Sequence, residues 1–158
     1  MTRLELLQLL DEKGIEYEIT EHVPVFTIEE MFEAKLPFPE IIAKNLFIRD
    51  DKKRNYYLIT VNEERKINLK EFQEQFGTRK LSFASENDLM SIMGLTKGSV
   101  TPFGLLNDDE KKVKFFIGEE FIHGKLGIHP LENTATVWMK TTDLIEMIKE
   151  HGNSVVVW

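Results

Sequence analysis

The helices that this sequence can form are short, because start and stop signals recur along the chain. Ser, Thr or Asn before a helix can accept hydrogen bonds from its free backbone N–H groups, and Gly after the last turn allows a left-handed exit. Caps of this kind delimit helices near residues 2–13, 28–34, 68–76 and 85–93, and a further helix is expected at 142–150. The segments between these helices are therefore left to form strands and loops.

Alternating apolar and polar residues predict strands between these helices. The polar turn at residues 50–55 makes the flanking segments a hairpin. No repeat or linker interrupts the chain, so 1–158 is expected to be one compact α+β domain with a mixed, largely antiparallel sheet flanked by short helices. The predicted strands are 15–20, 41–49, 56–62, 80–83, 113–117, 134–139 and 154–158.

Composition narrows the class of protein. The chain has 158 residues, 42% of them hydrophobic, which is enough for a folded core without disulfides, and it contains no Cys. It shows no apolar segment of membrane-spanning length and no leader peptide, so a cytoplasmic location without membrane association is expected. A net charge of −7 argues against DNA binding or a broad nucleic-acid surface, yet it allows contact with one end of an RNA.

The spacing of apolar residues also predicts which side chains are buried. Leu4, Leu7 and Leu10 are expected on the buried stripe of the first helix. Methionines and phenylalanines at helical spacing are expected in the core, namely Met31, Met90, Met93, Phe32, Phe38, Phe72 and Phe76.

Three polar segments carry residue types that suit a small hydrolytic site. The loop Gly98–Gly104, with a proline inside, can bring backbone N–H groups close to a ligand and hold them rigid. Lys44 stands among apolar residues at a strand start and offers one cation, and His129 opens a His-Pro-Leu-Glu-Asn-Thr turn. Together they suit a small polar ester or amide whose reaction builds negative charge on oxygen.

In this order and spacing, Ala-Lys-Asn-Leu (43–46), Gly-Ser-Val-Thr-Pro-Phe-Gly (98–104) and the turn at 129–134 resemble a known family. It comprises the YbaK/ProX-type trans-editing aminoacyl-tRNA deacylases, related to the insertion domain of bacterial prolyl-tRNA synthetase. The resemblance covers nearly the whole chain and is greatest to the free-standing branch that hydrolyses mischarged alanyl-tRNA(Pro). It implies a curved mixed sheet, a reaction without metal or cofactor, and participation of the ribose 2′-hydroxyl. The implied partners are the acceptor end of tRNA(Pro) and prolyl-tRNA synthetase.

The resemblance also implies roles for individual residues. Lys44 would hold the terminal phosphate or the ester region, Gly98 would contribute to a backbone nest for the carbonyl, and His129 would face the substrate pocket. These three are the expected catalytic residues. The expected substrate-binding residues are His22, Asn45, Ser99, Val100, Thr101, Pro102, Asn133 and Thr134.

The residues alone leave ordinary structural roles open. Lys44 can lie at a strand end with its amine in water, the Gly98 loop can be a simple turn, and His129 can be a surface residue. The Glu120–His123 pair appears once, whereas carboxylate-bridged metal sites repeat it, so no metal is expected. Two other functions also stay open: a deacylase for cysteinyl-tRNA(Pro) or another small aminoacyl-tRNA, and a non-catalytic module that binds an acceptor end or a synthetase.

Overall fold

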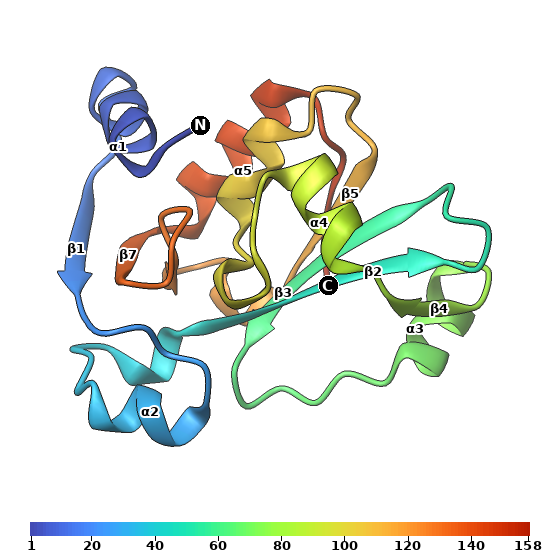
Figure 1. Cartoon of the computed structure of the whole chain (residues 1–158), viewed down its shortest axis with the longest axis horizontal. Coiled ribbons are helices and arrows are strands. Elements are labelled where there is room, and N and C mark those ends of the chain that lie inside the picture. Colours follow the sequence, from blue (N-terminus) through green and yellow to red (C-terminus); the bar gives the residue numbers. More distant parts are fainter.

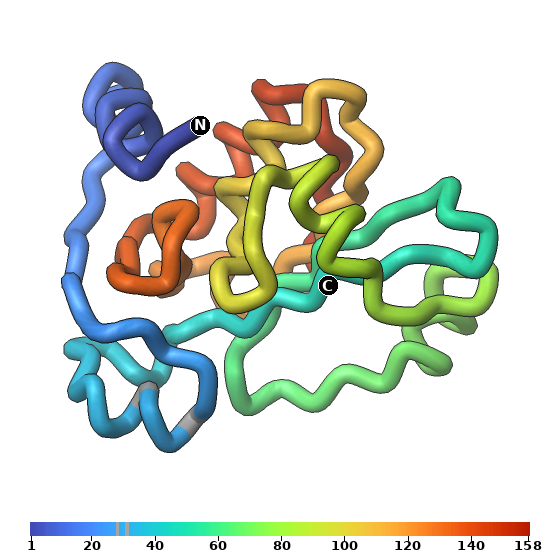
Figure 2. The backbone as a smooth tube through the Cα atoms, in the orientation of Figure 1, coloured from blue at the N-terminus to red at the C-terminus, as the bar shows by residue number. Residues whose placement is uncertain are grey.

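The computed structural model describes residues 1–158, except the side chains of Ile28 and Met31 (Figures 1 and 2). The helices are α1 (Arg3–Glu12), α2 (Ile28–Glu33), α3 (Leu69–Phe76), α4 (Glu86–Met93) and α5 (Thr141–His151). The strands are β1 (Tyr17–Glu21), β2 (Ala43–Asp50), β3 (Tyr56–Asn62), β4 (Leu81–Phe83), β5 (Val113–Ile117), β6 (Lys125–Ile128), β7 (Ala135–Lys140) and β8 (Val155–Val157). Short 3₁₀ turns occupy Pro39–Ile41, Lys97–Ser99, Pro102–Asn107 and Glu119–Phe121. None of the helices in this described part of the chain has the length and apolar character needed to cross a membrane.

The predicted α+β class is confirmed, but the strands divide between two sheets. The larger sheet has the order β4-β2-β3-β5-β8 and is mixed, because β2 pairs antiparallel with β3 and β4, while β5 pairs parallel with β3 and β8. The smaller sheet, β1-β7-β6, is antiparallel. An isolated parallel bridge between Ile42 and Gly127 joins the two sheets at the start of β2.

The predicted helix caps are present. Thr2 accepts from the Glu5 N–H in a capping box, and Asn68 and Ser85 accept from the first turns of α3 and α4. Of the stripe expected on α1, Leu10 is fully buried and Leu7 is half-buried against the core, but Leu4 is wrong, being 67% exposed, and Leu6 is fully buried instead. Side chains four residues apart share a helix face, so burial of Leu6 and Leu10 turns Leu4 outward.

Side chains alternate between the two faces of the larger sheet. On β2, Phe47 joins the cluster beneath α4 and α5, whereas Ile48 joins Phe72 of α3 on the opposite face. The predicted burial of Phe72 and Met93 is confirmed. Other members of that predicted set behave differently: Phe32 and Met90 are exposed, Phe38 and Phe76 are half-buried, and the side chain of Met31 lies outside the described part of the chain.

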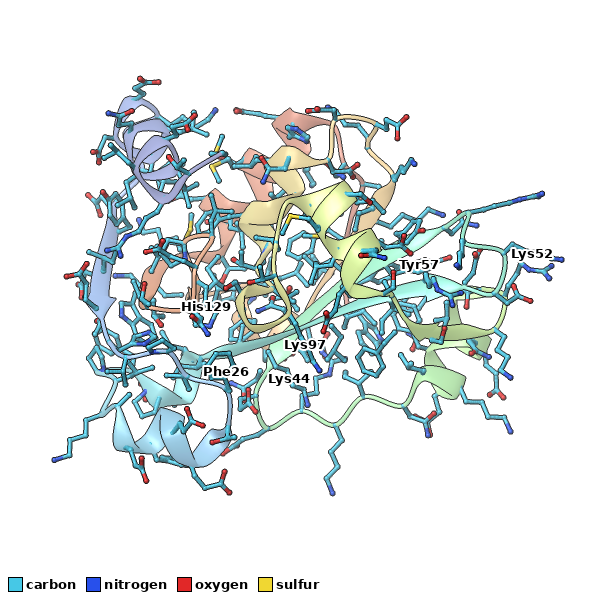
Figure 3. All side chains as sticks on the ribbon, viewed as in Figure 1. Phe26, Lys44, Lys52, Tyr57, Lys97 and His129 are labelled. Carbon is cyan, nitrogen blue, oxygen red and sulfur yellow. The ribbon has the colours of Figure 1, made fainter. Side chains whose placement is uncertain are left out.

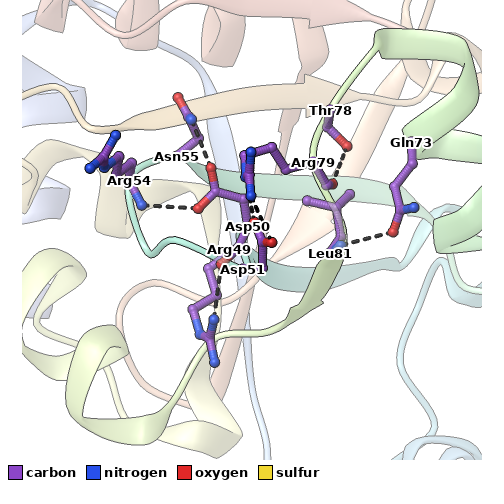
Figure 4. A network of polar contacts seen from close by, with 9 residues as sticks. All are labelled: Arg49, Asp50, Asp51, Arg54, Asn55, Gln73, Thr78, Arg79 and Leu81. Carbon is purple, nitrogen blue, oxygen red and sulfur yellow. Dashed lines mark hydrogen bonds and ion pairs between the residues drawn. The ribbon is translucent and has the colours of Figure 1, made fainter.

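A polar network fixes the end of the β2–β3 hairpin that lies away from Lys44 (Figure 4). The buried carboxylate of Asp50 accepts from the Arg54 N–H at 3.0 Å and from Asn55 Nδ2 at 2.8 Å. Arg79 donates through Nε and Nη2 to both carboxylate oxygens of Asp51. The hairpin turn is thereby tied to the segment between α3 and β4.

Candidate functional site

Two small adjoining cavities lie where the sheets meet. The inner compartment, about 190 Å³, is lined by His22, Phe26, Glu63, His129 and Thr136 among others. The central compartment, also about 190 Å³, is lined by residues that include Lys44, Asn45, Lys97, Gly98, Val100 and Gly127. His129 and Thr136 belong to both, so the two compartments form one site. Figure 3 shows Phe26, Lys44, Lys97 and His129 in the same region, contributed by separate segments.

Gly127 of β6 lies where the two sheets meet, because it forms the isolated bridge to Ile42. A Cβ at this position would collide with the ring of Trp138, which is 1% exposed, and would lie 3.1 Å from Thr136 Cγ2. The indole is itself held in place, because its Nε1–H donates to Thr20 Oγ1 at 3.0 Å. The absence of a side chain at Gly127 therefore leaves room for the Trp138 ring of the neighbouring strand β7, and Gly127 forms part of one wall of the central compartment.

Lys44 lies near the start of β2, opposite Val61 of β3, and is half-buried. Its position combines the two roles considered from sequence, because it stands at a strand end and also lines the central compartment. Burial raises the pKa of Glu63, and the positive charge of Lys44 partly offsets this effect. The site thus places one cation and one acid within electrostatic reach of each other.

Asn45 is oriented by a neighbouring strand. Its Oδ1 accepts a hydrogen bond of 2.6 Å from the hydroxyl of Thr60, which is fully buried in β3. Because that bond occupies the amide oxygen, the Nδ2 group is the part of Asn45 suited to donate to a ligand. Asn45 lines the central compartment next to Lys44, so the two residues present donors together.

His129 is held as a neutral imidazole. Burial lowers its pKa; the hydrogen bond to the Ala135 carbonyl opposes this effect, and the nearby His22 adds to it. The Nδ1 atom lies 2.9 Å from the Ala135 carbonyl oxygen, which can only accept, so Nδ1 carries the proton. In the neutral ring Nε2 is then an acceptor.

His22 forms a second ordered imidazole, with its ring centroid 6.1 Å from that of His129. Its Nδ1–H donates to the Val23 carbonyl at 2.8 Å, and Nε2 lies 2.8 Å from the hydroxyl of Thr136. His22 lines the inner compartment, and its contacts fix the chain that leads from β1 to Phe26.

In the glycine loop (Gly98–Gly104), some residues line the site and others lie behind it. Gly98 and Val100 line the central compartment. Ser99 donates its N–H to the Thr96 carbonyl at 3.0 Å, and the buried Thr101 hydroxyl donates to the His129 carbonyl at 2.6 Å. Buried Pro102 starts a 3₁₀ turn. The structure therefore places Ser99, Thr101 and Pro102 in the support of the loop and of His129.

In the His-Pro-x-x-Asn-Thr turn (residues 129–134), His129 lines the site, and Asn133 and Thr134 support it. The Nδ2 atom of Asn133 would lie 3.0 Å from a Cβ added to Gly98, so Asn133 packs directly against the glycine loop. The Thr134 carbonyl accepts from the His22 N–H at 2.9 Å, and its hydroxyl donates to Glu132. Thr134 thus holds His22 in place from behind the compartment wall.

Sequence reasoning did not identify several residues that line the site: Glu63, Lys97, Gly127 and Thr136. Two of them had a usable signal, since Lys97 precedes Gly98 and Glu63 directly follows the strand that pairs with Lys44. Glu120 has a structural role instead of the metal role considered, accepting from the Asn62 N–H and from Arg65. Among the described side chains, no group of three or more His, Asp or Glu residues is placed to hold a metal ion.

Comparison with known proteins agrees with this geometry. The sequence matches the family model of the aminoacyl-tRNA editing domain over residues 22–147, a range that includes His22, Lys44, Gly98 and His129. The prolyl-tRNA editing protein ProX of Acetoanaerobium sticklandii is 42% identical over 146 residues, which cover 92% of this chain and 89% of that protein. The prolyl-tRNA synthetase associated domain-containing protein 1 of Mus musculus is 36% identical over 160 residues, covering 98% and 94% of the two chains.

The fold is found among solved structures as well. A crystal structure described as a candidate trans-editing enzyme for prolyl tRNA synthetase superposes with a TM-score of 0.71 at 16% identity, covering 99% of this chain and 96% of that one. At that identity the likeness concerns the fold alone, whereas the family model and the relatives above concern the sequence. On this basis the chain belongs to the aminoacyl-tRNA editing domain family.

Proposed function

We propose that this protein is a trans-editing deacylase that hydrolyses the ester between alanine and the 3′ end of tRNA(Pro). The observation that carries the proposal is the placement of Lys44 beside two small compartments that share His129. Membership of the editing family and 42% identity to a prolyl-tRNA editing protein support the same activity.

A small compartment is what an editing site for alanine requires. A synthetase pocket built for proline rejects a smaller apolar amino acid only weakly, because a missing methylene is worth about 1–3 kcal/mol. A second site that admits the smaller product and excludes the larger one removes the error. The small size of the inner compartment, about 190 Å³, supports a preference for a small amino acid.

The reaction needs little from the protein, because an aminoacyl ester is already activated. The oxygen of a water molecule bonds to the carbonyl carbon, the bond from that carbon to the ribose oxygen breaks, and a proton passes to the ribose oxygen. Lys44 and the Nδ2 group of Asn45 donate toward the negative charge that develops on oxygen. Neutral His129 can accept a hydrogen bond from the substrate through Nε2. Glu63 accepts a hydrogen bond from the α-ammonium group of the amino acid.

Deacylation of tRNA(Pro) charged with alanine, cysteine or proline, without added metal, tests the proposal. Alanine is expected to be released fastest and proline to be retained. Fast release of cysteine would assign the chain to the alternative specificity, and no release of any of the three would leave a binding module.

The site itself is tested with a matched pair of lysines. Lys44→Ala is expected to lower the rate by about a hundredfold or more, the loss typical of removing a donor to a developing oxyanion. Lys52→Ala changes the same residue type on the exposed hairpin turn at the other end of β2 and is expected to leave the rate unchanged (Figure 3). An unaffected Lys44→Ala enzyme would contradict the assignment.

A further inference from the structure

Phe26 is an aromatic side chain presented to solvent at the mouth of the site. It is 68% exposed, although exposing a phenylalanine ring forfeits the free energy that its burial would contribute. Its backbone is nevertheless anchored, because its N–H lies 3.4 Å from Glu30 Oε2 and the next residue, Thr27, caps α2. A fixed backbone with an exposed ring is the arrangement of a contact surface.

The ring lies directly against the glycine loop. A Cβ added to Gly98 would lie 2.5 Å from Phe26 Cε1 and 3.1 Å from Cδ1, so the ring edge rests where any other residue would have a side chain. Beyond this contact a groove of about 490 Å³ runs between Val25, Phe26, Lys97 and Gly98, here called the Phe26 groove. Figure 3 shows Phe26, Lys44 and Lys97 close to one another.

The groove continues from both compartments. Phe26 also lines the inner compartment, and Lys97 and Gly98 also line the central one. A ligand whose ester lies beside Lys44 can therefore extend into the Phe26 groove without crossing a wall. The lining combines an aromatic face with a lysine, the pair of groups with which proteins bind a stacked base and its phosphate.

We infer that the Phe26 groove binds the 3′-terminal nucleobase of the aminoacylated RNA, stacked on the ring of Phe26, while Lys97 contacts the adjoining phosphate. This inference rests on the proposed function, because it places the base next to the ester-binding site. Stacking is possible for any base, so it would strengthen binding of an RNA end without selecting its sequence.

The test combines a substitution of Phe26 with removal of the terminal base from the substrate. An acceptor-stem hairpin of tRNA(Pro) is charged with alanine and ends either in adenosine or in a ribose that lacks its base, and kcat/KM is measured for both. In the wild-type protein the base is expected to raise kcat/KM by about 5- to 160-fold, the range for one stacked base. Phe26→Ala is expected to lose most of this factor, so that its kcat/KM values for the two substrates become nearly equal.

Two further variants complete the experiment. Phe26→Tyr keeps an aromatic face and is expected to retain the effect of the base, while Phe32→Ala removes a ring of similar exposure, 65%, outside the compartments and is expected to leave it unchanged. If Phe26→Ala slows both substrates equally, or if the base has no effect in the wild-type protein, the inference is wrong. Hydrolysis of neither substrate by the wild-type protein would instead refute the proposed function.

Discussion

The neutral state of His129 couples the stability of the protein to pH. Burial, the largest cause, lowers the pKa of this imidazole in the folded protein, and proximity to His22 lowers it further. The unfolded chain has an ordinary histidine pKa near 6.5, so it takes up the proton before the folded protein does. The stability that neutral His129 contributes is therefore fully present above the pKa of the unfolded chain. It is lost as the pH falls from there through the lower pKa of the folded protein.

Replacement of His129 by Asn is expected to reduce this pH dependence. Asparagine can keep an N–H donor near the Ala135 carbonyl but does not titrate. We expect the free energy of unfolding in urea to fall more steeply for the wild type than for His129→Asn between about pH 7.5 and 5.5. Equal slopes for the two proteins would mean that His129 is not held neutral by the fold.

Gly98 tests the contact with Phe26 at the same scale. The nearest obstacle to a Cβ at Gly98 is the far end of the exposed Phe26 ring, which can swing away at little cost, and the Asn133 amide, at 3.0 Å, has to shift only slightly. Gly98→Ala is therefore expected to change stability by less than about 1 kcal/mol while lowering kcat/KM several-fold. The combined loss in the Gly98→Ala, Phe26→Ala double variant should be smaller than the product of the two single losses, because both changes remove one interaction. Fully additive losses would show that the two residues act independently.

At the scale of elements, the junction of the two sheets determines the shape of the site. Gly127→Ala would place a methyl group against the ring of Trp138, which is buried and hydrogen-bonded and so cannot move aside as Phe26 can. Overpacking of this kind costs about 1–3 kcal/mol. We expect Gly127→Ala to lose stability in that range, measured by urea unfolding. Gly124→Ala is the control, since nothing lies within 4 Å of a Cβ at that position, and an equal loss in both would contradict the argument.

Most elements of this fold could be predicted from the sequence because their signals are local. The hairpin partner 56–62 and the strand 113–117 have the predicted bounds, and the caps at Asn68 and Ser85 begin helices as expected. The β6 strand (Lys125–Ile128) was missed, because it is four residues long and contains Gly127, which weakens a strand signal. Its conformation depends on β7 and on the bridge to Ile42, which are not local to it.

The site was predictable to the extent that its residues lie in recognisable segments. Lys44 and Gly98 stand in motifs and line the central compartment, and His129 lines both compartments. Phe26 and Thr136 reach the site only because β1 pairs with β7 and the chain then turns back over the glycine loop. No spacing in the sequence encodes that arrangement, since pairing between distant strands brings these side chains together.

For the whole molecule, the net charge of −7 limits how RNA can be held. Counterion release makes the binding of a single strand weaken with salt by a slope of about −0.7 per phosphate contacted, on logarithmic axes. The described site offers two lysines, Lys44 and Lys97, beside the compartments. Only Lys97 is assigned to a phosphate, because Lys44 faces the ester, so the predicted slope is about −0.7, equivalent to a roughly 2.6-fold loss of affinity for a fourfold rise in salt.

Titration of an acceptor-stem hairpin carrying alanine through a non-hydrolysable amide, over a series of salt concentrations, measures this slope. Lys97→Ala removes one contact and is expected to make the slope shallower by about 0.7, whereas Lys52→Ala, on the exposed hairpin turn, should leave it unchanged. A wild-type slope of about −5 or steeper would require a broad basic surface. Recognition would then extend well beyond the RNA end, and the two lysines would account for only part of the binding.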